Sequence, residues 1–94
     1  MKKLPYVKVE NIRSENSDRP IANQFIIRTD KGTYFQSYNS IIVLKQDGET
    51  YLDKDTWNYS TTTGKYRNIF LRETRKETEK KIKNGVYKLV NLNK

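Results

Sequence analysis

Short segments rich in apolar side chains recur through residues 24–53, as is typical of β-strands bounded by turns. Asp47-Gly48 interrupts this pattern and predicts a two-residue type I′ turn, because both central positions need a positive φ that Asp and Gly tolerate. The turn sets a register of Gln46 with Glu49, Leu44 with Tyr51, Val43 with Leu52 and Ile42 with Asp53. Both faces of this hairpin are apolar, so we expect it in the interior of a sheet.

A second turn signal, Asp30-Lys31-Gly32, precedes that hairpin. It predicts a three-residue loop with Gly32 in the left-handed conformation, so that Thr29 faces Thr33. This register assigns Phe25, Ile27 and Phe35 to a core face, and Arg28, Tyr34, Gln36 and Tyr38 to a mixed face that is partly open to water.

The N-terminal flank predicts an edge strand over residues 4–13, because its weak alternation includes lysines and Pro5. Residues 14–23 are polar, contain Pro20 and predict a loop.

Two helices are expected after the hairpins. The first begins near Ser60 or Thr61, and Tyr66, Ile69 and Phe70 then share one face, with Trp57 and Tyr59 packed beneath as core. The second begins at Thr74, which forms a capping box with Glu77, and ends at Asn84-Gly85. Residues 86–91 predict a closing strand. The fold class is therefore α+β: an antiparallel sheet of five or six strands, built from two consecutive hairpins, with two helices before the last strand.

The chain has 94 residues, which we interpret as one small domain spanning residues 1–94. It contains neither cysteine nor histidine, which removes disulfides, the usual zinc sites and the common nucleophile–base pairs. The first residues, MKKLPYVKVENIRSE, contain no apolar run typical of a signal peptide or membrane span. We therefore expect a cytoplasmic protein that does not bind membranes.

Four acidic residues, Asp47, Glu49, Asp53 and Asp55, are the densest in the chain and are the candidates for binding Mg²⁺. Two of them belong to an exposed turn, and no nucleophile or base accompanies them. We accordingly expect no catalytic residues, no metal site and no cofactor.

Positive charge is concentrated in the C-terminal third of the chain. The net charge is +8, and residues 65–88 carry nine basic and three acidic side chains, hence +6. Such asymmetry is typical of proteins that bind a polyanion or an acidic protein surface, although solubility alone also accounts for surface charge. The candidate phosphate-binding or partner-binding residues form a helical patch: Lys65, Arg67, Arg72, Arg75, Lys76, Lys80, Lys81 and Lys83.

An alternative binding surface is an aromatic platform on the mixed sheet face, made of Arg28, Tyr34 and Tyr38. Bases would stack on the tyrosines while the arginine contacts a phosphate. No sequence-specific nucleic-acid motif is present, so charge and shape would dominate binding.

Residues 19–92 resemble a family of small, largely uncharacterised proteins of phages, plasmids and conjugative elements of Gram-positive bacteria. The most specific segments are Tyr34-Phe35-Gln36-Ser37-Tyr38 and Trp57-Asn58-Tyr59-Ser60 continuing to Lys65-Tyr66. The resemblance carries no activity, but it implies a setting. Mobile-element accessory genes of this size commonly encode inhibitors of host defence, anti-CRISPR proteins among them, or proteins that handle transferred DNA.

We therefore expect a non-enzymatic inhibitor of a host-defence nuclease that blocks the loading of nucleic acid or guide. The alternative is a nucleic-acid-binding accessory protein with little sequence preference. The direct partner is a host-defence protein or its nucleic acid, and the oligomeric state stays open, a dimer included.

Overall fold

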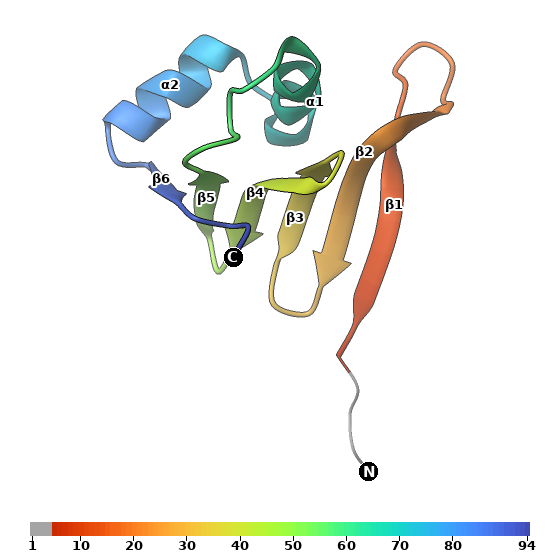
Figure 1. Ribbon diagram of the computed structural model, residues 1–94, viewed down its shortest axis with the longest axis horizontal. Helices are drawn as coiled ribbons and strands as arrows, with labels where there is room; N and C mark the ends of the chain where they lie inside the picture. The colour runs from red at the N-terminus through yellow and green to blue at the C-terminus, as the bar shows by residue number, and fades with distance from the viewer. Residues whose placement is uncertain (1–4) are drawn as a thin grey trace.

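The computed structural model describes residues 5–94 as a sheet with two helices (Figure 1). The elements in chain order are β1 (Val7–Arg13), β2 (Pro20–Thr29), β3 (Thr33–Ser37), β4 (Ser40–Gln46), β5 (Glu49–Asp53), α1 (Thr61–Leu71), α2 (Arg75–Lys83) and β6 (Tyr87–Val90). The first residue of the predicted N-terminal strand, Leu4, lies outside the described residues. No helix in the described part of the chain is long and apolar enough to cross a membrane.

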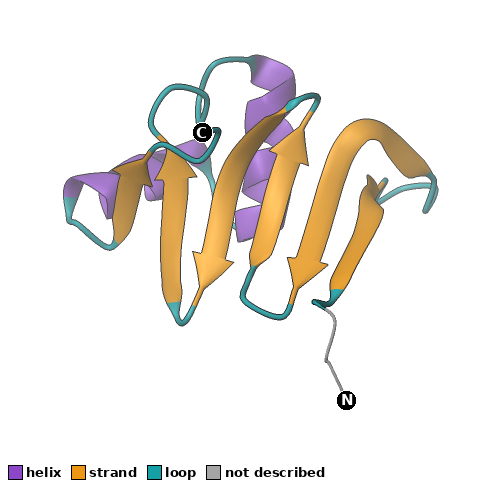
Figure 2. Cartoon of the chain, turned by 60° about the horizontal axis from the view of Figure 1, so that its bottom comes forward, coloured by secondary structure: helices purple, strands orange, loops and turns teal. Residues whose placement is uncertain are grey.

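The six strands form one sheet in the order β1-β2-β3-β4-β5-β6, and the fold class is α+β. Four of the five pairings are antiparallel, but β6 runs parallel to β5, which corrects the expected antiparallel sheet. Both helices lie between these two strands in the chain. A crossover of this kind returns the chain to the same end of the sheet, so the next strand runs parallel. The helices cover one face of the sheet and leave the other uncovered (Figure 2).

The hairpin at Asp47-Gly48 is confirmed. The two turn residues have φ values of 52° and 78°, as a type I′ turn requires. Three of the predicted pairs are observed, namely Gln46 with Glu49, Leu44 with Tyr51 and Val43 with Leu52. The hairpin also lies inside the sheet, between β3 and β6.

The predicted register of the first hairpin is wrong by one residue. Arg28 pairs with Thr33, so the loop has four residues, and Gly32 does not take the left-handed conformation. The Thr29 hydroxyl explains the longer loop, because it accepts hydrogen bonds from the backbone N–H groups of Lys31 and Gly32 at 3.2 and 3.0 Å. A shift of one residue exchanges the faces.

The exchange of faces changes the core of this hairpin. Phe35 pairs with Ile26 and is fully buried, whereas Phe25 pairs with Gln36 and Ile27 pairs with Tyr34 on the opposite, uncovered face. Phe25 and Ile27 are therefore not part of the face covered by the helices, and the expected core face was wrong for these two residues.

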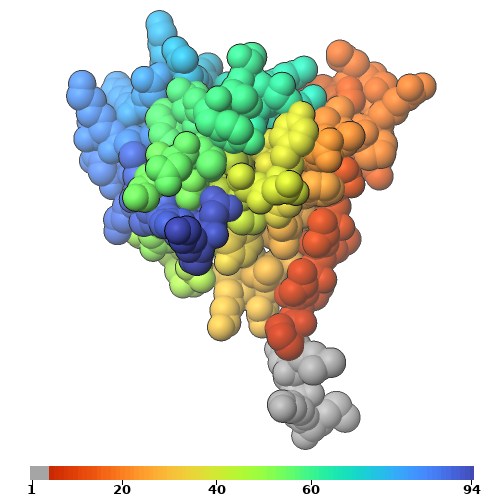
Figure 3. Space-filling model, in the orientation of Figure 1, coloured from red at the N-terminus to blue at the C-terminus, as the bar shows by residue number. Residues whose placement is uncertain are grey.

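The segment 14–23 is only partly a loop. β2 begins at Pro20, which pairs with Arg13, and the turn is closed by the Ser14 N–H donating to the Arg19 carbonyl at 2.8 Å. Proline can begin a strand because the first residue need not donate to the sheet. The turn projects at one side of the molecule (Figure 3).

Both helix starts are confirmed. The Ser60 hydroxyl accepts from the Thr63 N–H, and Thr74 forms the capping box with Glu77. Buried apolar residues from the sheet and α1 form the core, and six others pack partly buried against it: Ile26, Trp57, Tyr66, Ile69, Phe70 and Ile82. Tyr59 was expected in the core but is 50% exposed.

Candidate polyanion-binding surface

Arg67 belongs to the predicted helical patch, but it is buried and fully inaccessible to solvent. Its guanidinium lies 5.3 Å from the Trp57 ring and donates to the backbone carbonyl of Trp57 and to the side-chain oxygens of Asn58 and Asn68. Burial lowers the pKa of the guanidinium, and the charge of Arg75 lowers it further. Arg67 therefore joins the 57–58 segment to α1 and cannot contact a phosphate.

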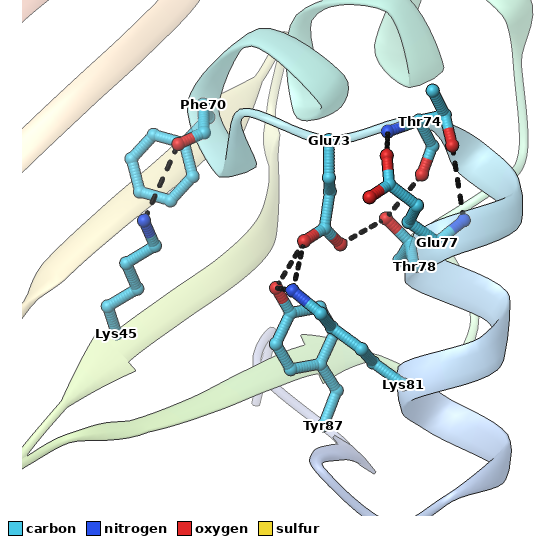
Figure 4. Close-up of polar contacts among 8 residues, drawn as sticks. All are labelled: Lys45, Phe70, Glu73, Thr74, Glu77, Thr78, Lys81 and Tyr87. Carbon is cyan, nitrogen blue, oxygen red and sulfur yellow. Dashed lines mark hydrogen bonds and ion pairs between the residues drawn. The ribbon is translucent and has the colours of Figure 1, made fainter.

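Lys81 is also engaged in an ion pair within the protein. Its Nζ lies 2.7 Å from the Glu73 carboxylate, and Glu73 is 3% exposed (Figure 4). The hydrogen bonds to Glu73 and Tyr87 raise the pKa of Lys81. Two of the eight predicted cations, Arg67 and Lys81, are thus structural.

The outer face of α2 keeps its positive charge. Thr78 is buried and Ile82 half-buried, so the opposite face, with Lys76, Lys80 and Lys83 spaced at i, i+4 and i+7, faces solvent. We call these three residues the α2 lysine stripe.

Both acidic residues of α2 are engaged away from the lysine stripe. Glu79 forms an ion pair with Arg75 at 3.2 Å, and Glu77 accepts from the Thr74 N–H in the capping box. Among the described residues the three lysines form no ion pair, so their charge is not compensated within the protein. Lys65 and Arg72 of the helical patch are also exposed.

The predicted aromatic platform does not assemble. Arg28 lies on the helix-covered side, where it bonds Glu10 at 3.0 Å, whereas Tyr34 pairs with Ile27 on the uncovered face. Tyr38 lies in the turn after β3 with a φ of 55°. The shift in register explains the failure, because it places Arg28 and Tyr34 on opposite faces.

A row of polar side chains that the sequence reasoning missed crosses the sheet on its helix-covered side. Lys8 pairs with Arg28, Arg28 with Thr33, and Thr33 with Lys45, on four neighbouring strands. Lys45 Nζ lies 4.9 Å from the ring centroid of Phe70 in α1, which shows that the row faces the helices. We call Lys8, Arg28, Thr33 and Lys45 the polar row. The correct register of the first hairpin would have revealed only the pair of Arg28 with Thr33, because Lys8 and Lys45 join the row through the β1–β2 and β3–β4 pairings.

A hollow of about 750 Å³ lies between β1, β2 and the end of α1. Besides part of the polar row, it is lined by Ile26, Ile69, Phe70 and Arg72. Burial lowers the pKa of the Lys45 ammonium, and the positive charge of Arg72 lowers it further. We call this hollow the groove.

The four acidic residues considered for Mg²⁺ do not form one cluster, and two of them are engaged in other contacts. Glu49 forms an ion pair with Lys88 at 2.9 Å. Asp53 is buried and accepts from the backbone N–H groups of Asp55, Thr56 and Leu92. In residues 5–94 no three acidic side chains are arranged to hold a metal ion.

A second hollow of about 750 Å³ lies beside the start of α1 and includes Asn58, Tyr59, Lys65 and Arg75. Two cations of the helical patch, Lys65 and Arg75, therefore lie on the same surface.

The comparisons with known proteins identify a family and no activity. No curated protein and no solved structure matches the chain. The model of DUF8033, a family of unknown function, matches residues 7–85, a range that extends from the start of β1 to the turn after α2 and includes both the α2 lysine stripe and the groove. The chain therefore belongs to the DUF8033 family.

Proposed function

We propose that this protein is a small non-enzymatic binder of nucleic acid that contacts the phosphate backbone through the α2 lysine stripe. The observation that supports this most directly is the uncompensated charge of Lys76, Lys80 and Lys83, whose acidic neighbours on α2 are engaged elsewhere. Lysine contacts phosphates as a point charge and does not identify bases. Binding would therefore show little sequence preference.

We propose host defence as the setting of this binding, on the basis of the resemblance to mobile-element proteins. A protein that covers the phosphate backbone of a guide or substrate would withhold it from a defence nuclease. Inhibition would then follow from binding alone, without catalysis, in the cytoplasm of a bacterial host. The pull-down of the protein from such a host, with and without nuclease treatment, tests whether captured proteins depend on nucleic acid.

The experiment that tests the nucleic-acid function is an anisotropy titration with mixed-sequence DNA and RNA. The variant Lys76→Glu/Lys80→Glu should weaken binding at least tenfold. The control variant Lys54→Glu/Lys94→Glu changes the charge equally at two exposed positions outside the stripe and should bind within about threefold of wild type. Equal losses in the two variants would show that net charge alone, and not this surface, drives binding.

The uncovered sheet face supports a second candidate function, docking onto a protein partner. One cross-strand row on this face carries Val9, Ile27, Tyr34, Leu44 and Tyr51. Val9 is 56% exposed, and large aromatic residues are favoured at the centre of protein interfaces. A protein partner that is captured after nuclease treatment, and is lost in a Tyr34→Ala/Tyr51→Ala variant, would favour this function.

A further inference from the structure

We propose that the groove between β1, β2 and the end of α1 holds a single strand of nucleic acid, with phosphates at Lys45 and Arg72 and bases against an apolar floor. This inference rests on the proposed function, because it specifies which form of nucleic acid the protein takes and adds the groove to the α2 lysine stripe as a contact surface.

The groove exists because the helices are narrower than the sheet. α1 packs mainly on β3, and α2 packs on β6. On the helix-covered side of β1, Ile12 joins the core cluster with Leu71 of α1, whereas Lys8 is exposed, so this side of β1 is covered only in part. The uncovered part of that side, together with Ile69, Phe70 and Arg72 from α1, encloses the hollow. Its volume is within the range of ligand-binding clefts.

The charge of the groove favours an anion. Its lining includes Arg13, Arg28, Lys45 and Arg72 but one carboxylate, Glu10. That carboxylate accepts both hydrogen bonds of the Arg28 guanidinium, at 3.0 and 3.1 Å. Lys45 and Arg72 form no ion pair within residues 5–94. Their mutual repulsion is relieved when a phosphate lies between them.

The direction of the groove suits a polymer. Arg28, Thr33 and Lys45 of the polar row line the groove, and Lys8 continues the row beyond it, so that the row extends across three strand spacings, roughly 14 Å in all. Consecutive phosphates of an extended strand can follow this row, whereas one small anion would occupy a single member of it.

The floor of the groove distinguishes a single strand from a duplex. Ile26, Ile69 and Phe70 are half-buried apolar side chains at its base. Unpaired bases offer apolar faces to such a surface, and proteins that bind single strands combine a cationic groove with such contacts. The bases of a duplex are stacked inside it, so a duplex would contact the rim alone.

The test compares a single-stranded oligonucleotide with a duplex of the same sequence, using wild type, Lys45→Gln/Arg72→Gln and the control Lys54→Gln/Lys94→Gln. We expect wild type to bind the single strand at least tenfold more tightly than the duplex. The groove variant should lose at least tenfold of the affinity for the single strand, and its log–log salt slope should decrease by about 1.4, or 0.7 for each lost phosphate contact. The control should retain the wild-type preference.

Two results would overturn the inference in different ways. Equal binding of single strand and duplex, with the groove variant matching the control, would place binding outside the groove and leave the proposed function standing. No binding of either form would remove both. Circular dichroism of each variant confirms that loss of affinity is not loss of fold, since Lys45 also approaches the Phe70 carbonyl at 3.5 Å.

Discussion

Lys81 Nζ lies 2.7 Å from Oε1 of Glu73, a carboxylate whose side chain is 3% exposed. The same carboxylate accepts from the Thr78 hydroxyl at 2.6 Å and from the Tyr87 hydroxyl at 2.8 Å. Three donors from α2 and β6 therefore converge on one residue of the linker between the helices (Figure 4). This cluster fixes α2 against β6 and so determines the direction in which the α2 lysine stripe faces.

Tyr87→Phe should destabilise the protein by about 1.5–3 kcal/mol, the typical net contribution of a hydrogen bond to a charged group. The substitution keeps the ring packing and removes the hydroxyl that Glu73 accepts from. Urea unfolding followed by circular dichroism measures the difference. The matched control is Tyr59→Phe, which removes a hydroxyl from a half-exposed ring and should change stability by less than about 0.5 kcal/mol. Equal effects in both variants would contradict the structural role of the cluster.

The stability of the protein should fall in acid partly because of Glu73. Burial, the largest influence, raises the pKa of Glu73, but the hydrogen bonds from Lys81, Thr78 and Tyr87 outweigh it, and the net pKa is lowered. The unfolded chain, where a glutamate has a pKa of roughly 4.3, then takes up the proton first. The contribution of Glu73 is therefore complete above this pH and is lost as the pH falls towards the pKa in the folded state.

Glu73→Gln tests this assignment, because it cannot titrate. The free energy of unfolding, measured by urea at several pH values, should depend less on pH below 4.3 in this variant than in wild type. Some dependence should persist. Burial raises the pKa of Asp53, but hydrogen bonds from Leu92, Thr56 and Asn93 outweigh it and lower the net value. An unchanged pH profile would show that Glu73 is not linked to acid unfolding.

Two glycines should respond to alanine in opposite directions. Gly64 lies inside α1, and a Cβ there would be 3.7 Å from the Arg67 guanidinium, an ordinary contact. Because alanine favours the helix, Gly64→Ala should stabilise the protein by about 0.5–1 kcal/mol. At Gly32 a Cβ would be 2.7 Å from the Lys45 carbonyl oxygen, so Gly32→Ala should destabilise by about 1–3 kcal/mol. Thermal unfolding of both variants checks the contrast, and a destabilised Gly64→Ala would contradict it.

The two hairpins show how far local sequence determines this fold. Asp47-Gly48 permits one tight turn, so its register followed from two residues. The earlier turn admits a loop of three or four residues, and the Thr29 hydroxyl stabilises the longer one through bonds that composition does not reveal. Because a sheet alternates with period two, this single difference reversed the faces of β2 relative to β3. The prediction was therefore correct for the elements and wrong for one face.

The candidate surface was harder to predict, because the charge of a residue type does not indicate whether its side chain is buried or exposed. Arg67 and Lys65 lie two residues apart on α1 and look alike in the sequence, yet Arg67 is buried and Lys65 exposed. The difference comes from Trp57, whose ring and carbonyl receive the guanidinium. Likewise, Lys45 belongs to the polar row only because β4 pairs with β3, and this pairing is not evident from the residue itself.

Arg67→Ala should therefore destabilise the protein far more than Lys65→Ala. Truncation leaves the acceptors of Trp57, Asn58 and Asn68 without their donor and opens a cavity beside the indole, for a cost of about 3 kcal/mol. Lys65→Ala removes the same charge from the surface and should cost less than about 0.5 kcal/mol. Chemical unfolding gives both values. Similar stabilities for the two variants would mean that Arg67 is not structural.

Nucleic-acid binding, if it occurs through phosphates, should depend steeply on salt. Engagement of about four to six cations releases counterions and gives a slope of log affinity against log salt near −3 to −5. A protein partner docked on the uncovered face would bury Tyr34 and Tyr51, and its affinity would change far less over the same range. Titration at four salt concentrations separates these modes.

The same titration should be run on a variant that reverses charge without disturbing the fold. Reversing Lys81 is unsuitable, because a glutamate there would lie beside the buried Glu73 carboxylate and leave it without its cation. Lys76→Glu/Lys80→Glu avoids this problem, since both side chains face solvent. Its salt slope should be shallower than that of wild type by about 1.4–1.8, because two phosphate contacts are lost. An unchanged slope with reduced affinity would show that the α2 lysine stripe attracts nucleic acid from a distance without contacting its phosphates.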